Sequence, residues 1–391
     1  MRNHAAALRS LACGIALTAS LPAAMGAGPA DPSNVAIFGD WLAACDNVLT
    51  CTALALPLEE GGSTKTSDLL RFERPAGPNG SVAGITMDFG ESVVADLEAI
   101  EFRVDGKPIL TTVQNTLSQV KLPSDALRNS AETPSRALYL DQPGIALLID
   151  AMMTGETLEI AAGRGIQQGV SLSGLERALR WIDEQQDRVA TKTAFVARGD
   201  MSPLRVPEAQ PLPVVRRAGG HASPLDDADA KRHVAVIRQR VAQEVQPAEC
   251  DGLNGSQDAD SFVALAFVVD PRLAVVAVRC GVSGAYNHVA ALHGVDRLTN
   301  VSRPISIERN EAVVGDFDGN PGAPIVVNVG FDPANLRLWQ YSTGRGAGDC
   351  GNYAEWVWNG ERFALALHRS MPTCRGADRG DWPVAYRARV E

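Results

Sequence analysis

After its N-terminal segment the chain contains no apolar run approaching the roughly 18 residues that a membrane helix needs. It also has no excess of positive charge, since its formal net charge is -10 over 391 residues. The lack of a long apolar run predicts no membrane span. A negative protein repels nucleic acids and anionic membrane surfaces, so the sequence also predicts no nucleic-acid partner. A cationic partner would suit this charge better.

The N-terminal segment has the plan of a cleavable export signal. A basic start is followed by an apolar stretch at residues 11–21, and the small residues Ala24 and Gly26 lie three and one before the expected cut. An uncleaved anchor is the alternative, but the apolar stretch is short for a membrane span. We expect residues 1–26 to be removed, which leaves about 365 residues, a length that favours more than one domain.

The cysteines lack the spacing of a zinc site, because none belongs to a Cys-x-x-Cys pair or a Cys/His cluster. Six remain once Cys13 leaves with the signal. An even number in an oxidising compartment predicts disulfides, although six cysteines allow 15 pairings. Closeness in sequence favours three local bonds: Cys45–Cys51, Cys250–Cys280 and Cys350–Cys374.

The N-terminal part mixes strand and helix signals. Residues 101–104 and 107–110 flank an Asp-Gly turn, which predicts a hairpin, whereas the apolar run at residues 145–149 fits either a strand or a helical turn. A capping-box sequence at residues 173–176 predicts the start of a helix. We expect a mixed α+β domain over residues 35–199. The helix has an apolar stripe with Trp181 at its edge: Leu175, Ala178, Leu179 and Ile182.

The second half of the chain has a different composition. Prolines interrupt residues 200–224 repeatedly, which predicts a linker. Apolar residues at helical spacing, preceded by aspartates, then predict a connecting helix over residues 225–246. Short strand signals separated by turns predict a mostly antiparallel β domain over residues 250–391. The expected fold class is therefore α+β, with two domains.

Several blocks of residues stand out along the chain: Phe38-Gly39-Asp40-Trp41, Cys45-Asp46-Asn47, Cys51-Thr52-Ala53, the helix segment at residues 179–184, Gly284-Ala285-Tyr286-Asn287, the glycine-rich segment at residues 344–351, Cys374-Arg375-Gly376 and Trp382-Pro383. Together they resemble an uncharacterised secreted proteobacterial family with a six-cysteine plan, domain of unknown function 1176, and residues 38–51 also resemble the start of the invasion-associated locus B proteins. This similarity implies a Gram-negative envelope protein, periplasmic or secreted, and implies no known activity.

The glycine-rich segment at residues 344–349 superficially resembles a phosphate-binding loop. Dinucleotide loops lead into a helix, whereas the residues from Cys350 onward have the pattern of a strand, so a tight turn is the simpler interpretation. Its charged residues remain candidates for binding. With residues from the family blocks, the candidate binding residues are Arg345, Asp349, Tyr286, Asn287, Arg375 and Trp382.

Catalytic and metal-binding templates fit poorly. Residues 281–285 lack the final glycine of a nucleophile elbow. Asp316, Asp318 and Asn320 alternate as in a calcium loop, but Pro324 stands where such a loop tends to offer another carboxylate, so an Asx-rich turn is favoured. We expect no metal and no cofactor.

Trp356 and Trp358 alternate along an expected strand and therefore share one face. Buried packing is the simpler interpretation, whereas an exposed aromatic strip would indicate glycan or partner binding. Because no convergent catalytic set is visible, we expect a non-enzymatic envelope protein that binds a protein or a cell-wall component. The alternatives are a carboxylate-dependent hydrolase of envelope polymer and an inhibitor of a cationic secreted enzyme.

Overall fold

The computed structural model contains mostly β-structure. In its described part all strand pairs are antiparallel except one short pair, and three α-helices accompany the sheets. The α+β class is confirmed in this broad form. None of these helices is long and apolar enough to cross a membrane. The structure describes residues 34–57, 70–80, 84–86, 99–113, 137–138, 142–162, 166–244, 263–279, 285–308, 325–377 and 379–391.

The first sheet is built around a hairpin whose two strands are buried at every position. β2 (Trp41–Cys45) and β3 (Cys51–Ala55) pair from Trp41 with Ala55 to Cys45 with Cys51. The predicted Cys45–Cys51 disulfide closes the end of this ladder. The other strands of the sheet are β1 (Val35–Phe38), β4 (Arg71–Arg74), β5 (Gly84–Thr86) and β8 (Ala137–Leu138), in the order β1-β2-β3-β4-β5-β8.

A second sheet contains the predicted hairpin of β6 (Ala99–Val104) and β7 (Lys107–Val113). Its turn residues Asp105 and Gly106 both have positive φ, as this class of two-residue turn requires. β9 (Thr157–Ala162) and β10 (Ile166–Ser171) complete the sheet in the order β10-β9-β6-β7. Residues 145–149, which the sequence left open, lie in helix α1 (Gln142–Met152).

Helix α2 (Leu175–Gln185) buries the apolar stripe that its sequence predicts, and Trp181 lies at the edge of the same core. The predicted capping box is wrong. The N-cap is Gly174 in a left-handed conformation, without a side-chain cap. A Cβ at Gly174 would lie 1.7 Å from the Phe38 carbonyl oxygen, so the close approach to β1 fixes where the helix begins.

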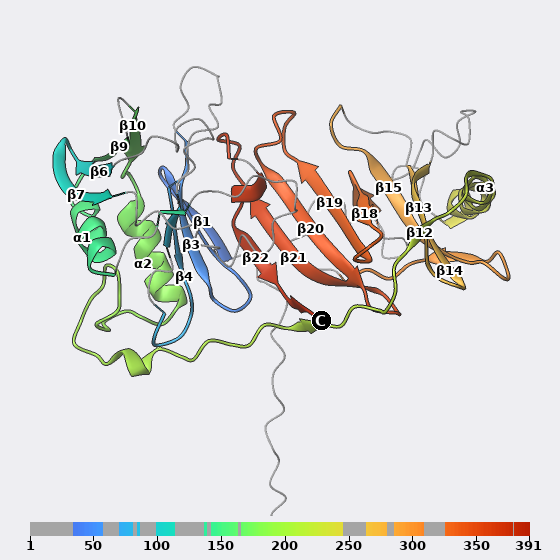
Figure 1. Cartoon of the computed structure of the whole chain (residues 1–391), viewed down its shortest axis with the longest axis horizontal. Helices are drawn as coiled ribbons and strands as arrows, with labels where there is room; N and C mark the ends of the chain where they lie inside the picture. Colours follow the sequence, from blue (N-terminus) through green and yellow to red (C-terminus); the bar gives the residue numbers. More distant parts are fainter. Residues whose placement is uncertain are drawn as a thin grey trace, which may run out of the picture.

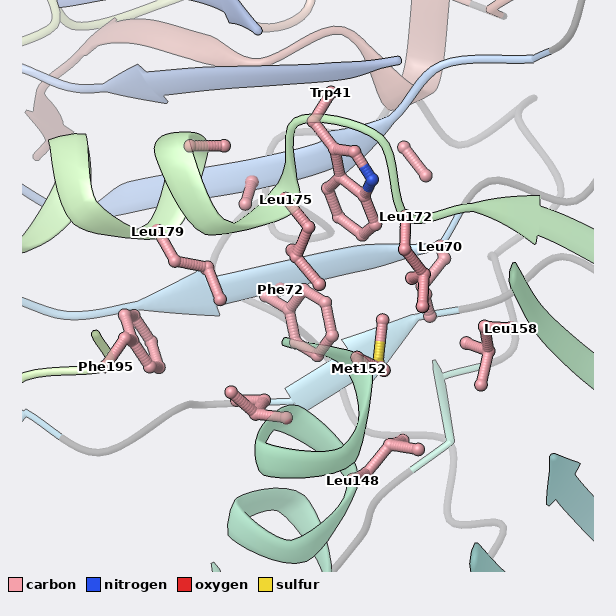
Figure 2. Packing of buried hydrophobic residues seen from close by; sticks show 14 of the residues in the cluster. Trp41, Leu70, Phe72, Leu148, Met152, Leu158, Leu172, Leu175, Leu179 and Phe195 are labelled. Atoms are coloured by element: carbon pink, nitrogen blue, oxygen red, sulfur yellow. The ribbon is translucent and has the colours of Figure 1, made fainter. Parts of the chain in front are cut away.

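Trp41 and Phe72 anchor the core beneath α2. Their rings stack with centroids 5.9 Å apart, and Figure 2 shows Leu175 and Leu179 of α2 pointing toward them, with Leu148 of α1 on the other side of Phe72. This cluster binds α1, α2 and the first two sheets into one unit.

A third sheet begins beyond residue 222, with helix α3 (Asp227–Glu244) on one of its faces. Val234 and Ile237 of α3 pack there against Ala274 and Val276. The opposite face, with Val275, belongs to another core cluster. The strands are β12 (Ser223–Pro224), β13 (Val263–Asp270), β14 (Leu273–Arg279), β15 (Val289–Asp296), β16 (Ser302–Pro304) and β17 (Ile325–Val327), of which the last also pairs with β15.

The last sheet lies between the first sheet and the third one, although it comes last in sequence (Figure 1). Toward the third sheet it presents Trp356 and Trp358, both buried, so the packing interpretation of this pair is confirmed. Toward the first sheet it presents Leu367 and Met371. Its strands are β18 (Gly330–Asp332), β19 (Arg337–Thr343), β20 (Gly351–Trp358), β21 (Phe363–Met371) and β22 (Val384–Arg387), in that order.

The proline-rich segment at residues 200–224 runs along one side of the molecule from the first part to the third sheet (Figure 1). Its second half is tied down. β11 (Val214–Val215) pairs in parallel with β23 (Arg389–Val390), the Ala218 N–H donates to the Trp358 carbonyl, and β12 joins the third sheet. Residues 208–210 are exposed.

We predict that a broad-specificity protease cuts this segment first at residues 207–211, because backbone hydrogen bonds protect it from Pro213 onward. The two pieces should remain associated after the cut, because Leu42 and Leu54 pack against the last sheet. Mass spectrometry of the cut protein and size-exclusion chromatography without denaturant check both points. First cuts at residues 213–224, or pieces that separate in native buffer, would contradict this arrangement.

Candidate functional site

The loop between β19 and β20 brings together two candidate residues as an ion pair. Arg345 Nε donates to Asp349 Oδ1 at 2.8 Å and Nη2 donates to Oδ2 at 2.5 Å. Asp349 Oδ2 also accepts the Gly376 N–H at 2.7 Å. The predicted Cys350–Cys374 disulfide joins the same two segments. The ion pair therefore holds the loop in place.

Close packing explains one glycine of this loop and the glycine that begins β20. A Cβ at Gly344 would lie 2.8 Å from Cys350 Sγ, and one at Gly351, whose φ is +135°, would lie 1.9 Å from the Ser342 carbonyl oxygen. The loop leads from strand to strand, as the sequence predicts, so no helix N-terminus is available here for a phosphate. Asp349 lies close to both sulfur atoms, but these are bonded to each other and are not thiolate ligands.

The other family-derived candidates differ in exposure. Asn287 donates to the Thr343 carbonyl at 2.9 Å and accepts the Thr343 N–H at 3.0 Å, so it fastens its loop to β19. Tyr286 is 43% exposed and lies beside Gly346. Trp382 is fully buried and donates to the Ala377 carbonyl at 3.1 Å. Its indole is therefore part of the core and does not reach a surface ligand.

Arg375 joins the first and last sheets. Its guanidinium pairs with Asp40 at 2.9 Å and donates to the Pro57 carbonyl at 2.9 Å. Burial disfavours the Asp40 carboxylate, yet hydrogen bonds from Ser171 and Arg375 outweigh burial and lower its pKa. The remaining predicted site residues lie outside the described residues: Cys250, Cys280, Asp316, Asp318 and Asn320.

The structure contains a groove that the sequence did not suggest. It has a volume of about 600 Å³ and lies beside α1, within the usual range of small-molecule sites, roughly 300–1,000 Å³. Its lining includes the apolar residues Ile145, Ile149 and Phe195, whose side chains are almost wholly buried, and three cations, Arg74, Lys192 and Arg198. We call this feature the α1 groove.

Asp183 of α2 positions two parts of the α1 groove at once. It is fully buried, pairs with Arg74 at 3.2 Å, and accepts the backbone N–H groups of Phe195 at 2.8 Å and Val196 at 2.9 Å. The Arg74 guanidinium stacks on the Phe195 ring, 4.1 Å from its centre. Asp183 therefore fixes the positions of Arg74 and Phe195, two lining residues of the groove. It directly follows the apolar stripe of α2 in sequence.

A second buried guanidinium, that of Arg188, contacts Thr193 of the groove lining. Arg188 is fully buried and donates to Gln186 Oε1 at 2.9 Å, Thr193 Oγ1 at 3.0 Å and the Gly77 carbonyl at 2.5 Å. Burial lowers the pKa of Arg74 to about 9, and the positive charge of Arg188 adds to this effect while Asp183 opposes it. The surroundings of the groove are therefore rich in positive charge, although the whole chain is acidic.

The residue types that line the α1 groove bear on its chemistry. Its lining within the described residues contains no carboxylate, imidazole, thiol or serine. The Thr193 hydroxyl is held by Arg188 and lies 3.1 Å from the Thr191 hydroxyl. General acid–base or nucleophilic catalysis needs a nucleophile within hydrogen-bond reach of a base, and these residues offer no such pair.

Comparison with known proteins places the chain among uncharacterised relatives. A family model described as "Protein of unknown function (DUF1176)" matches residues 35–389. The uncharacterized protein YpfG of Escherichia coli K12 is 27% identical over 365 residues, which cover 90% of this chain and 92% of that protein. Among solved structures, invasion associated protein B from Bartonella henselae matches 39% of this chain and 98% of its own, with 16% identity and a TM-score of 0.27.

We predict that Asp349→Asn destabilises the protein by about 1.5–3 kcal/mol at pH 7, the usual contribution of hydrogen bonds to a charged group. The hydrogen bond from Arg345 lowers the Asp349 pKa below 3.8. This stabilisation is present above the ordinary pKa and is lost as the pH falls through the lowered one. Urea unfolding of wild type and variant across pH 2.5–7 measures it.

The exposed Asp200 supplies the matched control. Asp200→Asn should leave the free energy of unfolding within about 0.5 kcal/mol of the wild type. A difference between Asp349→Asn and wild type that stays constant down to the lowest pH would show that the charge of Asp349 does not stabilise the loop.

Proposed function

The chain belongs to the DUF1176 family, and we propose that it is a non-enzymatic cell-envelope protein that binds a small ligand in the α1 groove. The observation that carries the proposal is the lining of this groove, which combines apolar side chains with the cations Arg74, Lys192 and Arg198. Concave, mostly apolar sites with a few polar groups are typical of ligand binding.

The proposed compartment is the periplasm or the exterior of a Gram-negative cell. The export-signal pattern at residues 1–26 supports it. So do the two disulfides, because such bonds form and persist in oxidising compartments.

We further propose that the two domains have different roles. Residues 35–199 would bind the ligand, because every described residue that lines the groove except Pro203 belongs to this range. Residues 250–391 would form a β domain that supports it, because the last sheet packs on the first one. This proposal keeps the domain plan expected from the sequence.

Binding is favoured over the alternative of a carboxylate-dependent hydrolase. Glycoside hydrolysis needs two carboxyl groups about 5–9 Å apart around the scissile bond. Two carboxylates that pair with cations of the groove are engaged in this way, since Asp183 pairs with Arg74 and Asp150 pairs with Arg198. We therefore expect purified protein to release no product from peptidoglycan or ester substrates above a no-protein control.

Filling the groove should abolish binding. Ala146 is an exposed residue of α1 that lines the groove, so Ala146→Trp should occupy it without disturbing the core. A small-molecule extract of the cell envelope should raise the melting temperature of the wild type by several degrees and leave that of the variant unchanged. Differential scanning fluorimetry measures both.

Leu147 supplies the matched control, because it is exposed on the same helix and does not line the groove. Leu147→Trp should respond to the extract as the wild type does. An equal response of Ala146→Trp and wild type, or turnover that a single carboxylate substitution abolishes, would refute the proposed function.

A further inference from the structure

Two histidines lie buried in the interface between α3 and the third sheet. His233 of α3 is 3% exposed, and His293 of β15 is 1% exposed. An imidazole ordinarily gains its positive charge near pH 6.5, and burial in apolar surroundings opposes that charge. The docking of α3 on the sheet therefore depends on pH.

Both imidazoles belong to the same apolar cluster. His233 lies about one helical turn from Ala230 and Ile237 on the buried face of α3. His293 alternates with Ala291 and Val295, so it shares the face of β15 that packs with α3. The helix and the sheet thus each place one histidine in their common interface.

The hydrogen bonds of the two rings suit the neutral form. His293 Nδ1 lies 3.4 Å from the hydroxyl oxygen of Ser302 on β16. His233 Nδ1 has no hydrogen-bond partner among the described residues. A charged His233 would carry an N–H group on both ring nitrogens, and the one on Nδ1 would be buried without an acceptor.

The surroundings of His233 also favour its neutral form. Burial is the largest cause that lowers its pKa, the positive charges of Arg232 and Arg297 add to this effect, and Asp229 opposes it. Arg232 and Asp229 belong to α3, whereas Arg297 lies in the turn after β15. The residues of β13 and β14 in this cluster are apolar: Val263, Ala266, Val268, Ala274, Val276 and Val278.

The sign of the pH effect follows from this lowered pKa. A histidine that is held neutral by docking stabilises the docked state fully above its ordinary pKa of about 6.5. Below it the docking equilibrium weakens, by up to about 10-fold per pH unit for each histidine, until the lowered pKa is reached. Between residues 227 and 237 only three apolar side chains of α3 are buried to hold the helix in place: Ala230, Val234 and Ile237.

We propose that α3 covers the third sheet at neutral pH and detaches from it in mild acid, when His233 and His293 take up protons. Detachment makes the apolar face of β14 and β15 beneath the helix accessible. This device is independent of the α1 groove, which is lined by residues 74–80, 145–149 and 192–203.

Hydrogen exchange of the mature chain, corrected for the intrinsic pH dependence of exchange, tests the proposal. Between pH 7.5 and pH 5.0 the protection of the amides at residues 230–237 should fall at least 10-fold. The protection of the β20 and β21 amides should change less than 2-fold. Carboxylates ordinarily titrate at about pH 4, so this window isolates the histidines.

Neutral substitutions identify the groups responsible. In His233→Leu/His293→Leu the protection at residues 230–237 should change less than 2-fold between the two pH values, because leucine fits the apolar interface and carries no charge. His233→Gln/His293→Gln makes the same test with a neutral polar side chain if the leucine variant does not fold. The exposed His288 supplies the matched control, and His288→Leu should lose protection as the wild type does.

Three results would overturn the proposal. The first is equal protection of residues 230–237 at both pH values in the wild type. The second is a loss that the double variants show in full. The third is a loss that extends equally to β20 and β21, because acid would then unfold the surrounding structure and not detach α3 alone.

Discussion

The structure depends on burial of both faces of the β2–β3 hairpin. Side chains alternate along a strand, so neighbouring residues point to opposite faces. Trp41, Ala43 and Ala53 face α2 and the core beneath it, whereas Leu42, Ala44, Leu54 and Leu56 face the last sheet. A hairpin that is buried on both faces connects two hydrophobic cores, and a large-to-small substitution within it would cost about 2–5 kcal/mol.

Charged groups border this interface and fix its orientation. Asp46 follows β2, is 2% exposed and pairs with Arg387 of β22 at 2.6 Å. Burial raises the Asp46 pKa even though Arg387 and two backbone N–H groups favour its charge. Removing one partner of such a buried pair costs about 3–5 kcal/mol, because the other charge stays buried without compensation. The same hairpin packs against α2, and Asp183 of α2 fixes Arg74 and Phe195 in the lining of the α1 groove.

Local patterns in the sequence predicted local features of the fold. The Asp-Gly turn of β6–β7, the apolar stripe of α2, the pair of buried tryptophans and the two short-range disulfides each follow from residues close together in the chain. The start of α2 was missed because Gly174 is required by contact with β1, which lies more than 130 residues earlier. Trp382 was taken for a binding residue because a motif carries no information on burial. The groove was missed because tertiary packing assembles it from residues 74–80, 145–149 and 192–203.

Native-state hydrogen exchange in increasing denaturant most directly tests the claim that the β2–β3 hairpin couples the two cores. The slowest amides of β2 and β3 and those of β20 and β21 should open with the same free energy and the same dependence on denaturant, because neither sheet keeps its buried face without the other. Exchange of the β20 and β21 amides through a separate opening of lower free energy, while β2 and β3 stay protected, would contradict this coupling.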